Sequence, residues 1–488
     1  MFRQRFLIFL FIFFPFVLSA QPLQKFVTQQ TNIAALKGSL WGGVAAYTKT
    51  PNTPLFALQA DTRLTPASTL KLLTTAAALE TFGPQHRFQT RLYATAAPDV
   101  NGVLHGDLYL RGGGDPTLGS IRVTGAETMQ TVLDKWYQAI EAAGIKQIAG
   151  NIYADVSLFD GPSVAPKVNW ENMGNYYAAP VSPLCLNDNA FEIYFDPQPQ
   201  DGGAVSVART VPDISGLALQ SFVTADAKNK KDNAYVYGAP GQYQLKIFGT
   251  IPATSKEFKI KGALPDPALF AAQALRKQLV TQDIVVKGAA KTIATAPDYE
   301  SMQLLHTYYS PTLKDIVVIV NKRSFNLYAE MLLRNLAVAA GKKGSLQNGL
   351  NELNVFLRKR NLAGANDTVL YDGSGLSRDN LLTPRTLLNV LAYMAQSPYF
   401  SDYYHSLATP DDRGDLLLLR RFLKPQKKVN EVRIKGGTID GVKAIAGYTR
   451  DQNGKLIAFV MIANNLAQKD EGLFRAHEDI IKQLLELE

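Results

Sequence analysis

A helix is predicted to begin in the stretch Thr65-Pro66-Ala67-Ser68-Thr69-Leu70-Lys71. Thr65 is suited to cap the helix, and Pro66 is suited to its first turn. Residues three apart share one helical face, so the Ser68 hydroxyl and the Lys71 amine can meet. A free serine is a weak nucleophile, and a neighbouring amine can take its proton. Because Ser-x-x-Lys also fits an ordinary surface pair, other motifs must decide between the two interpretations.

The composition predicts a secreted globular protein. Of its 488 residues, 46% are hydrophobic and 19% are charged, which fits roughly two to four packed domains. Residues 1–20 are predicted to be a signal peptide, in which Arg3 and Arg5 precede an apolar run and Ser19-Ala20 offers a cleavage site. The expected location is therefore periplasmic or secreted. An uncleaved anchor stays a minor alternative, because the run is short for a membrane span.

The charge and the cysteine content limit which binding partners and which disulfides we expect. The net charge of +9 is scattered along the chain, which leaves open a peripheral association with a membrane or a cell wall. We find no phosphate-binding loop or dinucleotide fingerprint, and we expect no nucleic-acid partner and no cofactor. The single Cys185 allows no intrachain disulfide and is interpreted as a small buried side chain.

The order of the predicted elements indicates a discontinuous domain. Residues 84–299 contain many short β-like runs punctuated by Pro and Gly, with helices predicted at 127–143 and 267–279. The C-terminal part instead predicts helices followed by an antiparallel sheet: helices at 321–340, 349–359, 384–397 and 473–487, and strands at 433–435, 443–449 and 456–464. We therefore expect an α/β (α+β) fold in which residues 21–83 and 300–488 form one domain and residues 84–299 are one or two inserted β-rich domains.

Two further motifs accompany Ser68 and Lys71. Ser324-Phe325-Asn326 lies near the start of the helix predicted at 321–340, and Lys435-Gly436-Gly437-Thr438 lies on a predicted strand. Each motif alone is weak. Together, in the order Ser-x-x-Lys, Ser-x-Asn and Lys-x-Gly, they are far more specific.

With these motifs the chain resembles the active-site serine penicillin-recognising enzymes. It most closely resembles the D-alanyl-D-alanine carboxypeptidase/endopeptidase family of low-molecular-mass class C penicillin-binding proteins. The long insertion between the first two motifs favours this family over related β-lactamases. Other stretches that resemble it are Gly112–Leu118, Pro183–Asn189, Ser310–Leu313, Asp372–Arg378 and Ala446–Tyr448. The resemblance implies a serine β-lactamase/penicillin-binding transpeptidase-like domain, with an antiparallel sheet flanked by helices.

The resemblance and the chemistry imply a role for each motif residue. Ser68 is expected to attack the bond between two D-alanines of a peptidoglycan stem peptide, and Lys71 to accept its proton. Lys435 is expected to lower the pKa of Lys71 by like-charge repulsion and to bind the terminal carboxylate. Ser324 would relay a proton and Asn326 would hold Lys71 and the substrate amide.

The remaining binding roles rest on the resemblance. Gly437 and Thr438 are expected to bind substrate, with the backbone N–H groups of Ser68 and Thr438 forming an oxyanion hole. β-Lactam antibiotics would acylate Ser68 in the same way. By resemblance, three residues approach the stem peptide's diaminopimelate: Asp155, Phe159 and Arg378. A carboxylate that caps a strand end is an equally good interpretation of Asp155.

One position departs from the resemblance, and several alternatives stay open. The family usually has Thr where this chain has Gly436, which removes a hydroxyl expected to help bind the substrate carboxylate. The alternatives are a β-lactamase or esterase of the same superfamily, and a non-catalytic cell-wall-binding homologue. None of the five His residues lies in a His-Glu-x-x-His motif, so no metal site is expected.

Overall fold

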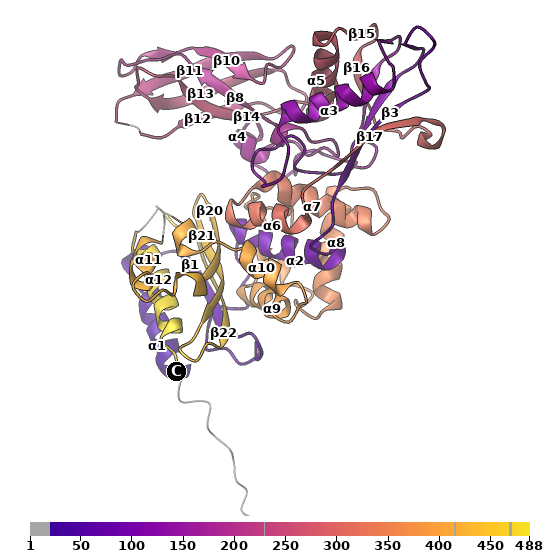
Figure 1. The fold of residues 1–488 in the computed structure, drawn as a ribbon. Helices are drawn as coiled ribbons and strands as arrows, with labels where there is room; N and C mark the ends of the chain where they lie inside the picture. The colour runs from indigo at the N-terminus through magenta and orange to yellow at the C-terminus, as the bar shows by residue number, and fades with distance from the viewer. Residues whose placement is uncertain (1–19, 229, 414–415, 468–470) are drawn as a thin grey trace, which may run out of the picture.

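The computed structural model describes residues 20–228, 230–413, 416–467 and 471–488. All but the last residue of the predicted signal peptide lies outside this range. Figure 1 shows a lower part, built from the two ends of the chain, and an upper part built from the middle of the chain. No helix in the described ranges is long and apolar enough to cross a membrane.

The lower part contains a five-stranded antiparallel sheet that joins the start and the end of the sequence. Its strand order is β2 (Phe56–Leu58), β1 (Leu40–Tyr47), β22 (Leu456–Asn464), β21 (Val442–Arg450) and β20 (Arg433–Ile439). Side chains alternate between its two faces, as they do in any strand. Val44, Val460 and Ile462 face one hydrophobic cluster, whereas Ala45, Phe459 and Met461 face another. β20 is an edge strand of this sheet.

Helices cover both faces of the sheet. One face packs against α1 (Ala20–Thr31), α11 (Leu417–Leu423) and α12 (Glu471–Leu485). The other face packs against a larger group of helices: α2 (Lys71–Phe82), α6 (Leu313–Lys322), α7 (Asn326–Ala339), α8 (Leu346–Lys359), α9 (Pro384–Met394) and α10 (Phe400–Ser406). The predicted antiparallel sheet flanked by helices is therefore confirmed.

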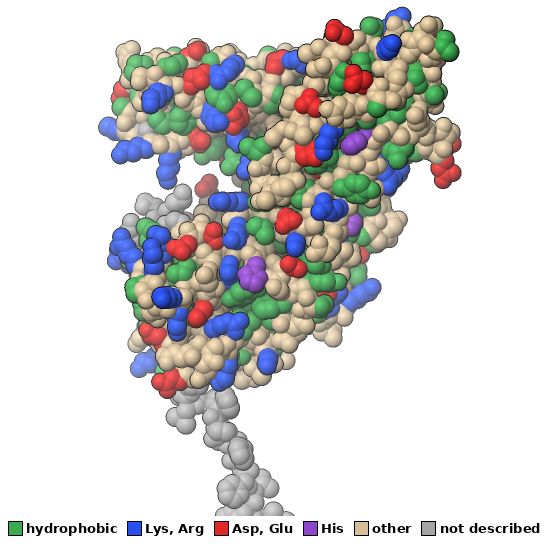
Figure 2. All heavy atoms as spheres, in the orientation of Figure 1, with side chains coloured by type: hydrophobic (Ala, Val, Ile, Leu, Met, Phe, Trp, Pro, Cys, Tyr) green, Lys and Arg blue, Asp and Glu red, His purple; other side chains and the backbone are tan. Residues whose placement is uncertain are grey.

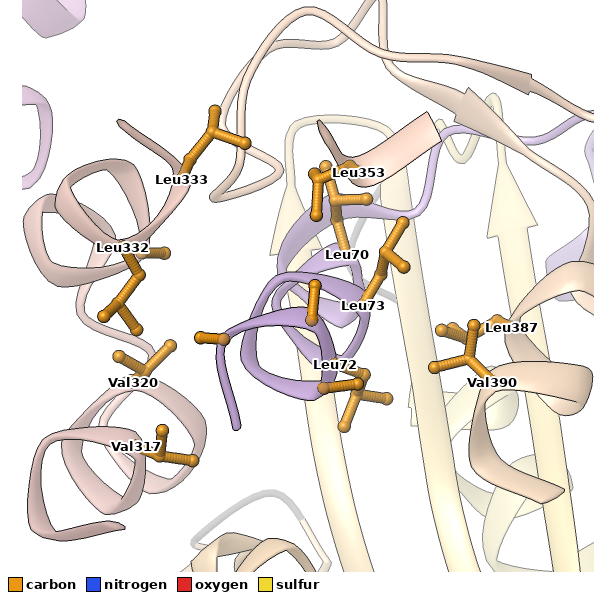
Figure 3. Packing of buried hydrophobic residues seen from close by; sticks show 14 of the residues in the cluster. Leu70, Leu72, Leu73, Val317, Val320, Leu332, Leu333, Leu353, Leu387 and Val390 are labelled. Atoms are coloured by element: carbon orange, nitrogen blue, oxygen red, sulfur yellow. The ribbon is translucent and has the colours of Figure 1, made fainter. Parts of the chain in front are cut away.

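Helix α2 lies at the centre of the larger group. Its residues from Lys71 to Leu79 are all buried, so no side of this stretch faces water. Leu70, Leu72 and Leu73 are at most 1% exposed. Figure 3 shows them packed among side chains of the surrounding helices: Val317, Val320, Leu332, Leu333, Leu353, Leu387 and Val390. Since burying each such leucine contributes about 1.5–3 kcal/mol, the start of α2 is held firmly in place.

The middle of the chain forms two groups of sheets and helices. The first contains a five-stranded sheet and a three-stranded sheet with two helices: β16 (Ala290–Ile293), β7 (Ile152–Asp155), β5 (Leu108–Arg111), β3 (Gln89–Ala94) and β17 (Gln303–Tyr309); β15 (Val285–Val286), β6 (Gln147–Ile148) and β4 (Val103–Leu104); α3 (Met129–Ala142) and α5 (Pro267–Thr281). The second contains a three-stranded and a four-stranded sheet: β10 (Val207–Val211), β8 (Ala190–Phe195) and β14 (Phe258–Ala263); β12 (Asn233–Tyr237), β13 (Gln244–Pro252), β11 (Ala218–Asp226) and β9 (Ala204–Val205). The short helix α4 (Trp170–Met173) packs against β12, and β18 (Thr368–Val369) pairs with β19 (Leu381–Leu382).

Three local expectations were wrong. β17 pairs with β3, so the strand at 303–309 belongs to the inserted sheet and the boundary at residue 300 falls too early. The helix expected at 321–340 is two helices, α6 and α7, because Ser324 adopts a left-handed backbone with φ +58° between them. Thr65 does not cap α2, since its hydroxyl donates to the Arg378 carbonyl and a 3₁₀ turn at Ala67–Leu70 precedes α2.

Candidate active site

Ser68 lies in a tight turn that two other segments press against. Ala67, just before it, has a left-handed backbone with φ +46°. A Cβ at Gly375 would lie 1.9 Å from the Ala67 carbonyl oxygen, and a Cβ at Gly437 would lie 2.8 Å from the Ser68 nitrogen. Both positions therefore need glycine, which lets the 372–378 loop and β20 approach the serine closely.

Lys71 forms a hydrogen bond with the Ser68 hydroxyl. Its Nζ lies 2.9 Å from Ser68 Oγ, as the three-residue spacing predicts. The same Nζ donates to Asn326 Oδ1 at 2.7 Å and to the Ser374 carbonyl at 2.5 Å. Although lysines are rarely buried, this side chain is 0% exposed. The structure therefore brings Ser68, Lys71 and Asn326 together.

Burial lowers the pKa of Lys71 from 10.5 to about 7. The charged ammonium loses its hydration inside the protein, which favours the neutral amine. The carboxylates of Asp372 and Glu330 partly offset this effect, because they attract the ammonium form. The sequence predicted a low pKa but attributed it to Lys435. In the structure the largest cause of the lowered pKa is instead desolvation by burial.

Ser324 and Lys435 form a second pair beside the first. Lys435 Nζ donates to Ser324 Oγ at 2.8 Å and to the carbonyl of Gly436 at 2.7 Å. Ser324 occupies the break between α6 and α7, where its left-handed backbone turns the chain toward β20. The three motifs, which are far apart in the sequence, thus meet at one place.

Asn326 is fixed by the segment that enters from the middle of the chain. It is the first residue of α7, and its side-chain amide donates to the Tyr177 carbonyl at 2.7 Å. Because the side-chain nitrogen donates to Tyr177, the side-chain oxygen Oδ1 faces Lys71 and accepts its hydrogen bond. Asn326 therefore has one orientation and holds the lysine amine near Ser68.

The 372–378 loop is held by two carboxylates, the buried Asp372 and the partly exposed Glu330. Glu330 Oε1 accepts from the backbone nitrogens of Gly373 and Ser374, both at 2.9 Å. Asp372 accepts from the nitrogens of Gly375 at 2.7 Å and Ser377 at 2.6 Å. Burial, followed by the nearby Glu330 charge, raises the pKa of Asp372 to about 6. These contacts fix the Ser374 carbonyl that Lys71 binds.

A cleft of about 550 Å³ opens over Ser68. Its lining comes from both parts of the molecule: Ser68, Ser324, Asn326, Gly375, Leu376, Arg378, Thr438, Ile439 and Asp440 below, and Asn169, Glu171, Asn172, Tyr177, Tyr235 and Tyr237 above. In Figure 2 the boundary between the two parts is recessed on the left, with Lys and Arg side chains on both margins. A larger groove of about 990 Å³ between α3 and α5 contains none of the motif residues.

The substrate-binding side chains expected from the resemblance separate into two groups. Arg378 and Thr438 line the cleft. Asp155 is 2% exposed, and its carboxylate accepts from the Tyr299 hydroxyl at 2.5 Å and the Ser157 nitrogen at 2.7 Å. Phe159 lines a different cavity, and neither residue lines the cleft. The structure therefore supports the strand-end interpretation of Asp155 and does not bring Asp155 or Phe159 to Ser68.

The space beside Gly436 is occupied by an arginine. A Cβ at position 436 would lie 2.2 Å from Arg413 Nη1 and 2.6 Å from its Cζ, distances that real atoms do not reach. The guanidinium thus takes the place that a larger side chain would fill. This arrangement was not expected from the sequence, since Arg413 lies in no motif.

Other residues of the site were also missed. Tyr177, Tyr235 and Tyr237 enter the cleft from the inserted region, and no sequence pattern links them to Ser68. Ser374 lies within the stretch Asp372–Arg378 that resembles the family, but its role and that of Glu330 come only from their contacts with Lys71 and with the loop. Within the described ranges, no group of three or more His, Cys, Asp or Glu side chains is placed to hold a metal ion.

Curated relatives match most of the chain. A D-alanyl-D-alanine carboxypeptidase from Actinomadura sp. (strain R39) is 29% identical over 444 residues, which is 88% of this chain and 78% of that protein. The D-alanyl-D-alanine carboxypeptidase DacB of Haemophilus influenzae is 27% identical over 412 residues, which is 83% of this chain and 81% of that protein. The similarity therefore extends across both the motif-bearing part and the inserted region.

The fold and the family agree with these relatives. The crystal structure of penicillin binding protein 4 (dacB) from Haemophilus influenzae matches 94% of this chain and 99% of that chain, with a TM-score of 0.79 at 24% identity. Residues 23–485 match the D-Ala-D-Ala carboxypeptidase 3 (S13) family. Because that match spans nearly the whole chain and the three motifs meet at Ser68, the chain belongs to the D-Ala-D-Ala carboxypeptidase 3 (S13) family.

Proposed function

We propose that this protein is a serine D-Ala-D-Ala carboxypeptidase and endopeptidase that acts on peptidoglycan stem peptides. The observation that carries the proposal is the pair formed by Ser68 and Lys71. A hydroxyl lies 2.9 Å from a buried amine whose pKa is lowered to about 7, so a proton acceptor stands beside the nucleophile at neutral pH.

The first half-reaction forms an ester on Ser68. Its Oγ attacks the carbonyl carbon between the two D-alanines, and Lys71 takes the hydroxyl proton. The backbone N–H groups of Ser68 and Thr438 stabilise the resulting oxyanion. This assignment is supported by the close approach of β20, since a Cβ at Gly437 would lie 2.8 Å from the Ser68 nitrogen.

The second step releases D-alanine and regenerates the enzyme. Ser324 relays the proton held by Lys71 to the leaving amine, which returns Lys71 to its neutral form. The Ser324 hydroxyl is bound by Lys435 and lines the cleft. The C–N bond breaks, leaving an acyl group on Ser68 and a free D-alanine. Water then attacks this ester, with Lys71 again accepting a proton, and the shortened peptide leaves.

Substrate recognition is assigned to residues around the same cleft. Lys435 supplies a positive charge for the terminal carboxylate, and Thr438 offers a hydroxyl. Arg378 lines the side of the cleft where the stem peptide would extend. A penicillin carries a carboxylate and a reactive amide carbonyl in a similar arrangement, so it acylates Ser68 and inhibits the enzyme. We place the mature protein in the periplasm or outside the cell, after removal of residues 1–20.

Two alternatives remain for the test to exclude. A β-lactamase or esterase would use the same Ser68 and Lys71 but would turn over its ester rapidly. A non-catalytic wall-binding homologue would lack a competent site, and the intact contacts among Ser68, Lys71 and Asn326 weigh against it.

The test is release of D-alanine from an N-acylated peptide ending in D-Ala-D-Ala. The parent protein should release D-alanine, and penicillin should block the release. Ser68→Ala should abolish release while its melting temperature stays close to that of the parent. Rapid penicillin hydrolysis without peptide turnover would instead favour the β-lactamase alternative, and absence of both reactions would favour the non-catalytic one.

A further inference from the structure

Phe325 lies between the two cleft residues of the second motif, Ser324 and Asn326. Both of these neighbours line the cleft, whereas Phe325 does not and is only 5% exposed. Its ring is therefore turned away from the cleft and packs inside the protein. The contacts that hold this ring also restrict the two residues that flank it.

An arginine of the inserted region packs on the Phe325 ring. Arg122, which lies between β5 and α3, places its guanidinium carbon 4.3 Å from the centre of that ring. A cation is attracted to the electron-rich face of an aromatic ring, and the attraction grows as the pair is removed from water. Because the Arg122 side chain is only 26% exposed, this contact is largely sheltered from solvent.

Asp188 fixes the guanidinium over the ring. Its Oδ2 accepts from Arg122 Nε at 2.6 Å, and its Oδ1 accepts from the Tyr328 hydroxyl at 2.9 Å. Tyr328 packs edge-on against Phe325, with 4.7 Å between the ring centres and 89° between the ring planes. Phe325 is therefore held from two sides, by the guanidinium and by the tyrosine ring, and one carboxylate holds both of these groups.

Ser324 depends on such support more than Asn326 does. The Asn326 side chain has two hydrogen bonds of its own, one to the Tyr177 carbonyl and one from Lys71. Ser324 instead has a left-handed backbone with φ +58°, which is unfavourable for a residue with a Cβ and persists only where the surroundings fix it. Since Phe325 follows Ser324 directly, fixing its ring limits how the backbone at 324 can relax.

We propose that Arg122, locked in place by Asp188, is a positioning residue of the reaction, which holds Phe325 and thereby places the Ser324 hydroxyl for proton transfer. The proposal rests on the proposed function, because it assumes the proton relay through Ser324. Arg122 acts only through Phe325, since it does not line the cleft. The inserted region, which carries both Arg122 and Asp188, thus takes part in the chemistry as well as in lining the cleft.

The test is a double-mutant cycle on the rate of penicillin acylation. Arg122→Ala should slow acylation by roughly 3- to 30-fold, the range that loss of one cation–π contact allows. In the Ser324→Ala background the same change should slow acylation by less than about twofold, because the hydroxyl that the arginine positions is absent. On a peptide ending in D-Ala-D-Ala, Arg122→Ala should lower kcat and leave KM close to the parent value, because Arg122 makes no contact in the cleft.

Two further variants and a matched control complete the series. Arg122→Lys should fall between Arg122→Ala and the parent, because it keeps a charge beside Asp188 but not a planar group over the ring. Asp188→Asn should slow acylation as Arg122→Ala does, since it frees the guanidinium. Arg209→Ala is the control: Arg209 lies 3.9 Å from the centre of the Tyr194 ring and pairs with Glu257, which is the same arrangement outside the lining of the cleft. It should be acylated like the parent.

Two outcomes would overturn the proposal while leaving the proposed function intact. An equal loss from Arg122→Ala in both backgrounds would show that the arginine only supports the fold, and no loss in the parent background would show that Ser324 keeps its place without it. A parent protein that is not acylated at all would overturn the proposed function and this proposal with it. Melting temperatures identify any variant that fails to fold, and if Arg122→Ala is one, the same cycle is run with Arg122→Lys.

Discussion

Lys71 Nζ lies 2.9 Å from Ser68 Oγ and has no exposed surface, so the amine beside the nucleophile is largely sheltered from water. Burial is the main reason that its pKa falls to about 7. The burial that makes Lys71 a proton acceptor at neutral pH therefore also lowers the stability of the folded protein.

Acylation should depend on pH through the neutral form of Lys71. Because its pKa is lowered to about 7, the neutral fraction rises as the pH rises through 7. The rate of penicillin acylation should be about tenfold lower at pH 6 than on its alkaline plateau. Asp372→Asn removes a charge that raises this pKa, so the rise should move to lower pH. Stopped-flow acylation across the pH range measures both, with the exposed Asp61→Asn as a control whose profile should match the parent.

Replacing Lys71 should stabilise the protein in a pH-dependent way. Its folded pKa of about 7 is below the unfolded value of 10.5, so the unfolded chain binds more protons between these two pH values. Burial of the lysine therefore destabilises the fold progressively as the pH falls from 10.5 to 7. As the pH falls from 10.5 to 7, the free energy of unfolding of Lys71→Met should therefore rise relative to that of the parent. Below pH 7 the difference between the two proteins should stay constant. A difference that does not change with pH would contradict the lowered pKa.

The break at Ser324 can be tested with two substitutions that both remove the hydroxyl. Ser324→Ala and Ser324→Gly should lose acylation to a similar degree. Ser324→Gly should be more stable by roughly 1 kcal/mol, because glycine adopts φ +58° without the steric conflict of a Cβ. Denaturant unfolding of the two variants gives the comparison. Equal stability would mean that the backbone at 324 relaxes when the serine is removed.

Asp155 should act on stability rather than on substrate choice. Its carboxylate accepts from the Tyr299 hydroxyl inside the protein and does not line the cleft. Asp155→Asn and Tyr299→Phe should both lower the melting temperature, and neither should change the ratio of rates on peptides with and without a free diaminopimelate amine. A selective loss on the diaminopimelate peptide in Asp155→Asn alone would restore the recognition role.

The sequence predicted the motif residues better than it predicted their surroundings. Ser68 and Lys71 lie three apart on one helical turn, so local geometry was enough to bring them together. Apolar patterns likewise located the central sheet. Tyr235 and Tyr237, which line the upper side of the cleft, come from the insertion, and only tertiary packing brings them to the same cleft as Ser68.

The errors have physical reasons of the same kind. The apolar periodicity at 321–340 continues through Ser324, so a left-handed residue that splits the helix left no trace in the pattern. From the sequence, Gly436 was interpreted as the loss of a hydroxyl that helps bind the substrate carboxylate. In the structure the guanidinium of Arg413 fills the space beside Gly436, and Arg413 lies in no motif, so no pattern in the sequence indicated it.

The most direct test of the account is the intact mass of the protein after incubation with benzylpenicillin, followed by peptide mapping of the adduct. We predict a mass increase equal to one penicillin, located on Ser68 and absent from Ser68→Ala. An adduct on another residue such as Ser324, or no adduct on a correctly folded parent protein, would contradict the assignment of Ser68 as the nucleophile.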